Sequence, residues 1–455
     1  MGGGRGTMEL IPTGIPSLDK ALNGGFSRGS TILLAGNPGT GKTHLAIHIL
    51  YNNMRRGLKG AYVSFAETKK QFYRNALQAG IDLSKMEEVA LFRFYDMLTV
   101  PRDELEGMIA FLINDIVEFK PDIIVFDSVT VFGQMFGEEY LRSFLHSIIG
   151  RLVNAFDALA ILIDEIPYGE KRLGFGIEEF VVDGVIILEM ERTREVIRRY
   201  LTIPKMRGRP LRRSAYEYVI TEEGIEVFTV PELEFTEKEA LKSRFKTGIE
   251  GLDRLLGGGL YESSITLIAG PTGSGKTILA LNFASNLTSS GRNILYIAFE
   301  ESAAALKDTL HKLGLVENFE IISMVPEGRT PMEFYAFIKK LIEKESFNVL
   351  VIDSLSAMKA HMDEKEFIKA VRYLQLLAKE RRVTFILTYV TGSMTDLATT
   401  GFSTLVDNLL FLTYHVPKEA GKALKRYILV LKTRHSENDP TLREFTIGEG
   451  GIKIE

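Results

Sequence analysis

The sequence predicts an α/β protein made of two similar domains, each with a mostly parallel central sheet, helices on both faces and an antiparallel extension at one edge. Three observations predict this fold. A long internal repeat divides the chain in two, apolar strands alternate with helical segments in each half, and each half ends in several strands joined by short turns.

The internal repeat is seen most clearly in two pairs of segments. Thr13–Gly25 (TGIPSLDKALNGG) returns 234 residues later as Thr247–Gly259 (TGIEGLDRLLGGG). The same offset relates Gly36–Thr43 (GNPGTGKT) to Gly270–Thr277 (GPTGSGKT). A shared register over this distance indicates a duplicated domain, because coincident motifs would not keep one offset.

The repeat and the composition between its copies set the expected domain limits. We expect a flexible leader at residues 1–9, a first domain at 10–230, a linker at 231–245 and a second domain at 246–455. The linker (PELEFTEKEALKSRF, residues 231–245) is charged and has no strand-like run.

Short runs rich in β-branched residues predict the strands of each domain. Continuous apolar strands of this kind are typical of a parallel sheet that is buried on both faces. The predicted strands of the first parallel sheet are Thr31–Ala35, Ala61–Phe65, Ile123–Phe126 and Leu159–Ile163. Those of the second are Ile265–Ala269, Asn293–Ala298, Val349–Ile352 and Val383–Leu387. The antiparallel extension of the first domain is predicted at Arg199–Pro204, Glu217–Ile220 and Ile225–Val230.

Composition excludes several classes of chemistry. The chain of 455 residues has no cysteine, so disulfides, thiolate metal sites and cysteine nucleophiles are ruled out. Its apolar runs stay below the ~18 residues that a membrane span requires, and no signal peptide is recognisable, so we expect a cytoplasmic protein without a membrane partner. A net charge of -4 gives no general attraction to nucleic acid.

Both copies contain the complete phosphate-loop (P-loop) motif G-x-x-x-x-G-K-T between an apolar strand and a helical segment. Glycines let successive backbone N–H groups turn toward phosphates, and the helix N-terminus adds favourable partial charge. We therefore predict two ATP sites, in which Lys42 and Lys276 contact the β- and γ-phosphates, and Thr43 and Thr277 ligate Mg²⁺. The predicted ATP-binding residues are Gly36, Gly39, Thr40, Gly41, Lys42, Thr43, Gly270, Thr272, Gly273, Ser274, Gly275, Lys276 and Thr277.

An acidic residue ends the third predicted strand of each domain. The runs are IIVFD, ending at Asp127, and VLVID, ending at Asp353. An aspartate here is often only a helix N-cap, but its pairing with a P-loop upstream in both copies favours a role on Mg²⁺.

Glutamates follow the second predicted strand. The sequence is Phe-Ala-Glu-Thr in the first copy, with Glu67, and Phe-Glu-Glu-Ser in the second, with Glu300 and Glu301. We predict that these three glutamates are catalytic. Since neighbouring strand residues face opposite ways, at most one of Glu300 and Glu301 aligns the nucleophile, and the other orients it or contacts a neighbour. Ala66 replaces the first carboxylate, so the first domain would hydrolyse ATP slowly if that position faces the phosphate, unless Glu67 turns inward or the water is positioned otherwise. The alternative is a solvated acidic strand end.

A lysine and an arginine at i, i+2 occur late in each copy. They are Lys205 with Arg207 and Lys432 with Arg434. This spacing places both cations on one face of a strand, an arrangement suited to a phosphate. Because the pairs are far in sequence from the P-loops, we predict contact with a phosphate held by a neighbouring subunit; a solvated edge strand is the alternative.

Together these residues resemble the two-domain members of the KaiC family, in the RecA superfamily. The resemblance runs from about Thr13 to the C-terminus and includes the T-G-I-x-x-L-D lead-in, both P-loops, Phe299–Glu301, Gly176–Phe180 and the K-x-R pairs. It implies tandem RecA-like domains, slow ATP hydrolysis, ATP held between subunits and a homo-oligomeric ring, usually a hexamer.

The resemblance also implies a possible modification site. In this family an adjacent Ser-Thr pair in the second domain is autophosphorylated, and Ser403 and Thr404 occupy the matching places. The chain stops at Glu455, with almost nothing after its last predicted strand, so clock function and its regulators are not implied. The expected output is that of a sensor or signalling ATPase whose downstream partner the sequence does not reveal.

Two other functions compete with this reading. One is a RecA- or RadA-like ATPase that moves DNA, but Val129–Tyr140, which follows the Asp127 strand, contains no cation, so nucleic acid is disfavoured. The other is a nucleotide-gated scaffold in which the first domain only binds ATP, an idea motivated by Ala66.

Overall fold

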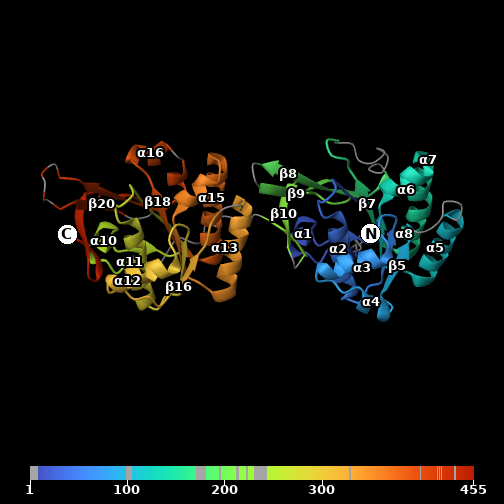
Figure 1. Cartoon of the computed structure of the whole chain (residues 1–455), viewed down its shortest axis with the longest axis horizontal. Coiled ribbons are helices and arrows are strands. Elements are labelled where there is room, and N and C mark those ends of the chain that lie inside the picture. The colour runs from blue at the N-terminus through green and yellow to red at the C-terminus, as the bar shows by residue number, and fades with distance from the viewer. Residues whose placement is uncertain are drawn as a thin grey trace, which may run out of the picture. The chain divides into compact units, whose positions relative to one another are not determined.

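The computed structural model of the chain consists of two compact units, residues 1–229 and 230–455, and each is described by itself (Figure 1). The structure describes residues 9–98, 105–170, 181–193, 196–211, 215–221, 224–229, 243–326, 329–399, 401–417, 419, 421, 423–434 and 437–455. The predicted leader except Glu9, residues 231–242 of the predicted linker and the Gly176–Phe180 motif lie outside these residues.

The first unit follows the predicted alternation of strands and helices. Its strands are β1 (Leu10–Ile11), β2 (Phe26–Ser27), β3 (Thr31–Gly36), β4 (Gly60–Ser64), β5 (Phe92–Asp96), β6 (Ile123–Asp127), β7 (Leu159–Glu165), β8 (Gly184–Thr193), β9 (Val196–Met206), β10 (Ala215–Thr221) and β11 (Gly224–Val227). Its helices are α1 (Pro16–Ala21), α2 (Lys42–Met54), α3 (Lys69–Gln78), α4 (Ser84–Glu88), α5 (Leu105–Phe119), α6 (Val129–Phe136), α7 (Glu138–Ser143), the π-helix η2 (Phe144–Ile149) and α8 (Gly150–Phe156).

The main sheet of this unit has, among the described residues, nine strands in the order β11-β10-β9-β8-β3-β7-β6-β4-β5. The six strands β8, β3, β7, β6, β4 and β5 run parallel to one another, whereas β9, β10 and β11 pair antiparallel. The inner parallel strands β3, β4, β6 and β7 are almost wholly buried because helices cover both faces, as the continuous apolar runs predict. The predicted parallel core with an antiparallel extension is therefore confirmed.

Two apolar cores lie on opposite faces of the sheet. One contains residues of α1, α2 and α3, and the other contains residues of α5, α6 and α8. Strand alternation divides β7 between them, since Ile161 and Ile163 pack on the α2 face and Leu162 packs on the other face. The face to which a residue belongs can thus be read from its position in the strand.

The second unit repeats this architecture. Its strands are β12 (Arg244–Phe245), β13 (Leu260–Tyr261), β14 (Ile265–Gly270), β15 (Ile294–Ala298), β16 (Glu320–Ser323), β17 (Val349–Asp353), β18 (Thr384–Val390), β19 (Asn408–His415), β20 (Lys425–Thr433), β21 (Arg443–Gly448) and β22 (Gly451–Ile454). Its helices are α10 (Glu250–Leu255), α11 (Lys276–Ser289), α12 (Ala303–Lys312), α13 (Pro331–Glu345), α14 (Leu355–Ala360), α15 (Glu364–Arg381), α16 (Met394–Thr399) and the 3₁₀ helix η3 (Phe402–Thr404).

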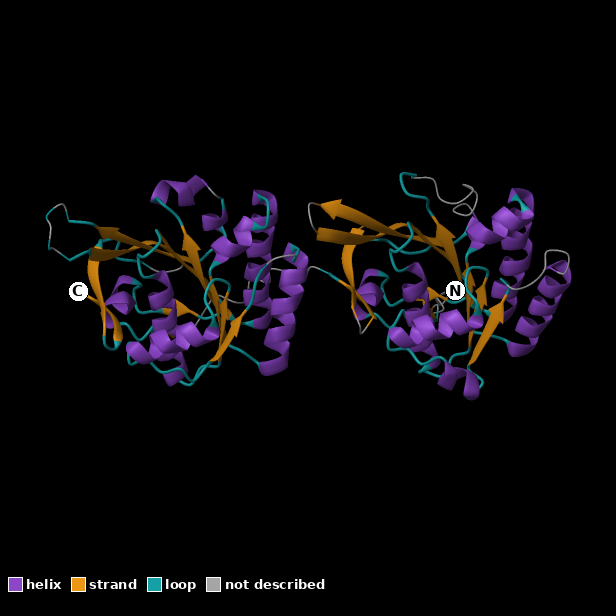
Figure 2. Cartoon of the chain, in the orientation of Figure 1, coloured by secondary structure: helices purple, strands orange, loops and turns teal. Residues whose placement is uncertain are grey.

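The strand order of the second sheet, over its described residues, is β16-β15-β17-β18-β14-β19-β20-β21-β22. Figure 1 shows α13 and α15 on one side of this sheet and α11 and α12 on the other, and Figure 2 shows the same layering of helix and strand in both units. Strand β12 pairs with β13 and occupies the last two residues of the predicted linker, so Arg244 and Phe245 are part of the second unit.

Candidate functional site

The P-loop of each unit joins the central strand of the sheet to the helix that follows. In the first unit the loop runs from Gly36, the last residue of β3, to α2, and in the second it runs from Gly270, the last residue of β14, to α11. The residue before each helix, Gly41 or Gly275, has a left-handed backbone conformation with φ of 92° and 101° respectively. This conformation favours glycine and turns the first helical N–H groups toward the loop.

Close packing explains the glycine that opens each motif. A Cβ atom on Gly36 would lie 2.2 Å from the carbonyl oxygen of Leu188 on the adjacent strand β8. A Cβ atom on Gly270 would lie 2.2 Å from the carbonyl oxygen of Leu412. No side chain fits at that distance, so the loop can leave the sheet here only through glycine.

The P-loop lysines are folded onto their own loops. The Nζ of Lys42 donates hydrogen bonds to the carbonyl oxygens of Gly36 (2.9 Å) and Asn37 (3.0 Å), and the Nζ of Lys276 donates to that of Pro271 (2.9 Å). Both side chains are largely buried, and burial lowers the pKa of each ammonium. Each loop therefore holds a buried cation that lacks a full anionic partner, as a phosphate site requires.

The strand-end carboxylate of the first unit lies next to the P-loop hydroxyl. The hydroxyl of Thr43 donates a hydrogen bond to Oδ2 of Asp127 (2.9 Å), and Tyr62, from the neighbouring strand β4, donates another to the same oxygen (2.6 Å). Burial is the main cause of the raised pKa of Asp127. The structure thus brings together the hydroxyl and the carboxylate that the sequence predicts on Mg²⁺.

Two hydroxyls also hold the strand-end aspartate of the second unit, those of a tyrosine and, in place of the P-loop threonine, of a threonine on β18. Tyr296 donates to Oδ2 of Asp353 (2.7 Å), and the hydroxyl of Thr388 donates to its other oxygen. In both units the peptide bond that follows the aspartate is cis. Sequence reasoning missed the two tyrosines, although the 234-residue offset relates Tyr62 to Tyr296 and could have identified them.

The glutamates of the second unit lie at the carboxyl end of β15, beside β17 and Asp353. Tyr296 and Ala298 pack on the α11 face of the sheet, which carries the P-loop helix, and Glu300 follows two residues after the strand ends. The charge of Glu300 acts on the P-loop lysine Lys276, so the two side chains lie near each other. The hydroxyl of Ser354 donates a hydrogen bond to Oε1 of Glu300. Burial, Asp353 and Glu300 together raise the pKa of Glu301.

The first unit has Ala66, which is exposed, at the position of Glu300. The next residue, Glu67, accepts a hydrogen bond from Nδ2 of Asn75 on α3 (3.1 Å). Burial is the largest cause of the raised pKa of Glu67, followed by the charge of Asp127. The charge of Asp127 therefore acts on Glu67, but the Glu67 carboxylate is hydrogen-bonded to Asn75 on α3, the helix that follows β4.

The K-x-R pairs lie near the amino-terminal ends of the parallel strands. The P-loop of the same unit lies at the carboxyl ends of these strands, which is the opposite edge of the sheet. Lys205 donates to the carbonyl oxygen of Val182 (2.8 Å), and Arg207 forms an ion pair with Asp183 (3.1 Å). Asp183 in turn accepts a hydrogen bond from the N–H of Thr31, the first residue of β3 (3.0 Å). The P-loop begins at the other end of β3, roughly 17 Å away at 3.3 Å per residue.

The second K-x-R pair is placed in the same way. Arg434 forms an ion pair with Asp407 (3.5 Å), which accepts a hydrogen bond from the N–H of Ile265 at the start of β14 (2.9 Å). Lys432 donates to the carbonyl oxygens of Val406 (2.7 Å) and Ser403 (3.1 Å). Neither pair can reach a phosphate in its own unit.

Ser403 and Thr404 lie in η3, just before β19, and so at the same edge of the sheet as the second K-x-R pair. The carbonyl oxygen of Thr404 accepts a hydrogen bond from Arg434. The hydroxyl of Thr404 donates to the carbonyl oxygen of Gly401 (2.7 Å), and its side chain is exposed. The two K-x-R cations thus hold the backbone of the predicted phosphorylation segment.

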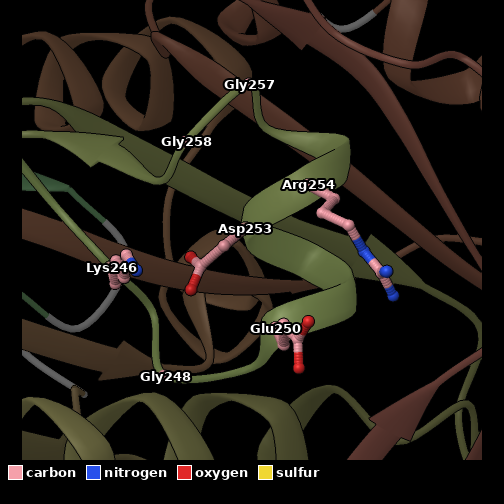
Figure 3. A pocket seen from close by; sticks show the side chains of 7 residues that line it. All are labelled: Lys246, Gly248, Glu250, Asp253, Arg254, Gly257 and Gly258. Carbon is pink, nitrogen blue, oxygen red and sulfur yellow. The ribbon is translucent and has the colours of Figure 1, made fainter.

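The lead-in motif of the second unit forms an open pocket, whose lining Figure 3 shows. It is lined by Lys246, Gly248, Glu250, Asp253, Arg254, Gly257 and Gly258. A Cβ on Gly248 would contact the side chain of Asn286, which is ten residues along α11 from Lys276. This places the pocket roughly 15 Å from the P-loop end of the helix. Asp253 accepts a hydrogen bond from the N–H of Thr247 (2.7 Å), so the motif mainly fixes the entry of the chain into the unit.

Two features are absent from the described part of the chain. Among these residues no group of three or more histidines, aspartates and glutamates is arranged to hold a metal ion. No helix among them is long and apolar enough to cross a membrane.

Comparison with known families decides the identity of this fold and its paired loops. The profile of the KaiC ATPase family matches residues 11–232 and again residues 245–455. The chain belongs to the KaiC ATPase family. Each match contains one P-loop, one strand-end aspartate and one K-x-R pair, so the KaiC-type ATP-binding domain is present twice.

Curated KaiC relatives match over nearly their whole length. The chain is 30% identical to the circadian clock oscillator protein KaiC of Picosynechococcus sp., over 98% of this chain and 90% of that protein. It is 30% identical to the protein of the same name from Synechococcus elongatus, over 97% and 88%. It is 28% identical to the circadian clock protein KaiC3 of Synechocystis sp., over 98% and 92%. The chain is thus a KaiC-type ATPase that binds ATP.

Proposed function

We propose that the chain is a ring-forming, Mg²⁺-dependent ATPase with one slow ATP site in each of the domains 10–230 and 246–455. The observation that carries the proposal is the repeated placement of a buried P-loop lysine next to a strand-end aspartate, Lys42 with Asp127 and Lys276 with Asp353. Two such sites in register are explained by nucleotide binding and by no purely structural requirement of the sheet.

The residues present fit a magnesium ion. Thr43 and Asp127 offer adjacent hard oxygen donors, and Thr277 and Asp353 are the corresponding donors of the second site. Magnesium usually takes few protein ligands and completes its coordination with water and phosphate oxygens, which agrees with the single carboxylate at each site. When bound, the ion would neutralise charge on the β- and γ-phosphates.

Hydrolysis requires that water attack the γ-phosphorus. A bond forms between the water oxygen and phosphorus, the bond to the β–γ bridging oxygen breaks, and ADP leaves. In the second domain Glu300 orients this water and accepts its proton, which then passes to solvent; the nearness of Glu300 to Lys276 and its hydrogen bond from Ser354 support this role. Lys276 stabilises the negative charge on the phosphates.

A ring of identical copies explains the position of the K-x-R pairs. Each pair lies at the sheet edge opposite the P-loop of its own unit, so a phosphate that it contacts must belong to another unit, which we infer to be the same unit of a neighbouring copy. Repeating one such head-to-tail contact closes a ring, and a hexamer is the expected number of copies. The same edge carries Ser403 and Thr404, so autophosphorylation would use the ATP of a neighbouring copy.

A DNA-moving ATPase is less well supported. That function needs basic, mobile loops after the aspartate strands. Here the chain forms helices α6 and α14 at these places, and α6 contains no cation. Strong stimulation of the ATPase by single-stranded DNA at physiological salt would nevertheless replace our proposal with this one.

The test is Mg²⁺-dependent ATP turnover by the full chain and by the variants Lys42→Ala, Lys276→Ala and their combination. We expect each single variant to lose the turnover of one domain, and the double variant to lose at least about a hundredfold in total rate. Phosphopeptide mapping of ATP-treated protein, with Ser403→Ala and Thr404→Ala as controls, tests the autokinase.

Unchanged turnover in the double variant would refute the proposed ATP sites. Absence of phosphate on Ser403 and Thr404 after prolonged incubation with MgATP would refute the autokinase alone.

A further inference from the structure

The two ATP sites differ in which strand carries the carboxylate beside the aspartate. Near the P-loop lysine of the second unit this carboxylate is Glu300, two residues after the end of β15. The first unit has Ala66 at that place but has an additional glutamate, Glu165, at the end of β7, where the second unit has Val390. One carboxylate is missing on one side of Asp127, and one is gained on the other side.

The sheet places Glu165 directly beside the first P-loop. Strand β7 lies between β3, which leads into the P-loop, and β6, which ends in Asp127. Glu165 is the register partner of Gly36, the first residue of the P-loop motif. The N–H of the next residue, Ile166, donates a hydrogen bond to the carbonyl oxygen of Gly36 (3.0 Å).

Strand alternation directs Glu165 toward the nucleotide side of the sheet. Ile161 and Ile163 of β7 pack in the core on the α2 face, and Glu165 continues this row. Asp164 points to the other face, where it accepts a hydrogen bond from Thr130 on α6. Glu165 is exposed at the end of the row, and its backbone N–H is held by the Thr130 hydroxyl (2.8 Å).

The charges around the P-loop lysine agree with this placement. The carboxylates whose charges act on Lys42 are Glu165, Asp127 and Asp164. In the second unit the carboxylates whose charges act on Lys276 are Asp353 and Glu300. Glu165 therefore lies near the first P-loop lysine, as Glu300 lies near the second.

We propose that Glu165 is the catalytic carboxylate of the first ATP site, where it takes the part that Glu300 takes in the second site. This proposal deepens the proposed function and rests on it. In the reaction the water oxygen bonds to the γ-phosphorus, the bond to the β–γ bridging oxygen breaks to release ADP, and Glu165 accepts the water proton before it passes to solvent. Glu67, whose carboxylate is bonded by Asn75, is the competing candidate.

The test uses the full chain with Lys276→Ala, so that the first site alone turns over. In this background we expect Glu165→Gln to lower kcat by about a hundredfold and to leave the affinity for a non-hydrolysable ATP analogue unchanged or tighter. Glu118→Gln, the same change at an exposed position on α5, controls for the substitution itself. Glu67→Gln should lower kcat less than Glu165→Gln does.

Moving the carboxylate to the other strand shows whether a lost rate is due to the missing carboxylate or to a less stable protein. Glu165→Val reproduces the residue of the second unit and should be inactive, and adding Ala66→Glu should restore at least about a tenth of the lost rate, because the carboxylate returns on the other strand.

Three results would overturn the proposal. They are a Glu165→Gln variant that keeps most of its turnover, a larger loss in Glu67→Gln, and a Lys276→Ala background that binds the analogue but has no turnover at all. The last result would leave the proposed function intact if Lys42→Ala still hydrolyses ATP at the second site. Loss of analogue binding and turnover at both sites of the unmodified chain would instead refute the proposed function.

Discussion

At the residue scale, each ATP site depends on a buried tyrosine that holds the strand-end aspartate. Tyr62 and Tyr296 are fully buried, and burial followed by the nearby aspartate raises the pKa of each phenol well above its usual range. Their hydroxyls therefore stay protonated and can only donate to the carboxylate. We regard both as positioning residues, since neither is placed to touch a phosphate.

Replacing these tyrosines should weaken metal binding more than it weakens folding. Tyr62→Phe leaves Asp127 with one donor fewer, and we expect the Mg²⁺ concentration for half-maximal turnover to rise by about tenfold or more in the Lys276→Ala background. Tyr296→Phe in the Lys42→Ala background should act in the same way on Asp353. A fall in kcat that saturating Mg²⁺ does not restore would contradict a positioning role.

At the element scale, the sequence predicted the strands and loops well because their causes are local. Continuous apolar runs predicted β3, β6, β14 and β17 within one residue of their observed ends. The P-loops were equally clear because their glycines, lysine and threonine are adjacent in the chain. Glu165 was not found, because its role depends on β7 lying between β3 and β6, and strand order is not encoded in any short motif.

The P-loop helix α2 shows another feature that depends on tertiary packing. His44 and His48 are neighbours on this helix, and their buried Nε2 and Nδ1 atoms, respectively, have no hydrogen-bond partner among the described residues. A Cβ on Gly224 would lie 1.7 Å from the ring of His48, so β11 covers it closely. Burial lowers the pKa of both imidazoles, and the charge of His44 lowers that of His48 further.

These histidines should make the first unit acid-sensitive. Because their pKa values are lower in the folded than in the unfolded state, the unfolded chain binds more protons as the pH falls below about 6.5, and folding stability is lost in that window. The double variant His44→Ile, His48→Asn carries the residues of the second unit, Ile278 and Asn282. Calorimetry of the full chain between pH 7 and pH 5 should show a smaller loss of melting temperature in this variant. An equal loss in both proteins would contradict the assignment.

At the scale of the whole molecule, we propose that each site is shared between two copies of the chain. The P-loop and the K-x-R pair of one unit lie at opposite edges of its sheet, so no single unit can supply both to one phosphate. The ion pairs of Arg207 with Asp183 and of Arg434 with Asp407 hold these cations near the sheet in the isolated chain. If assembly completes the site, we expect turnover per chain to fall when the protein is diluted.

Mixing inactive variants tests this sharing. In the Lys42→Ala background, Lys276→Ala removes a P-loop cation, and Arg434→Ala removes the cation offered to a neighbour. Because a mixed ring contains some sites with an intact P-loop and an intact Arg434, we expect the mixture to regain a measurable part of the turnover that each variant lacks. A mixture no more active than the sum of its parts would show that the pairs do not act between copies.

The most direct measurement of the central claim is the native mass of the purified chain with and without MgATP. Two ATP sites per chain that neighbouring copies complete predict a ring, expected to be a hexamer, that carries two nucleotides per chain and forms or tightens when MgATP is added. A chain that stays monomeric and binds no nucleotide in saturating MgATP would contradict the account.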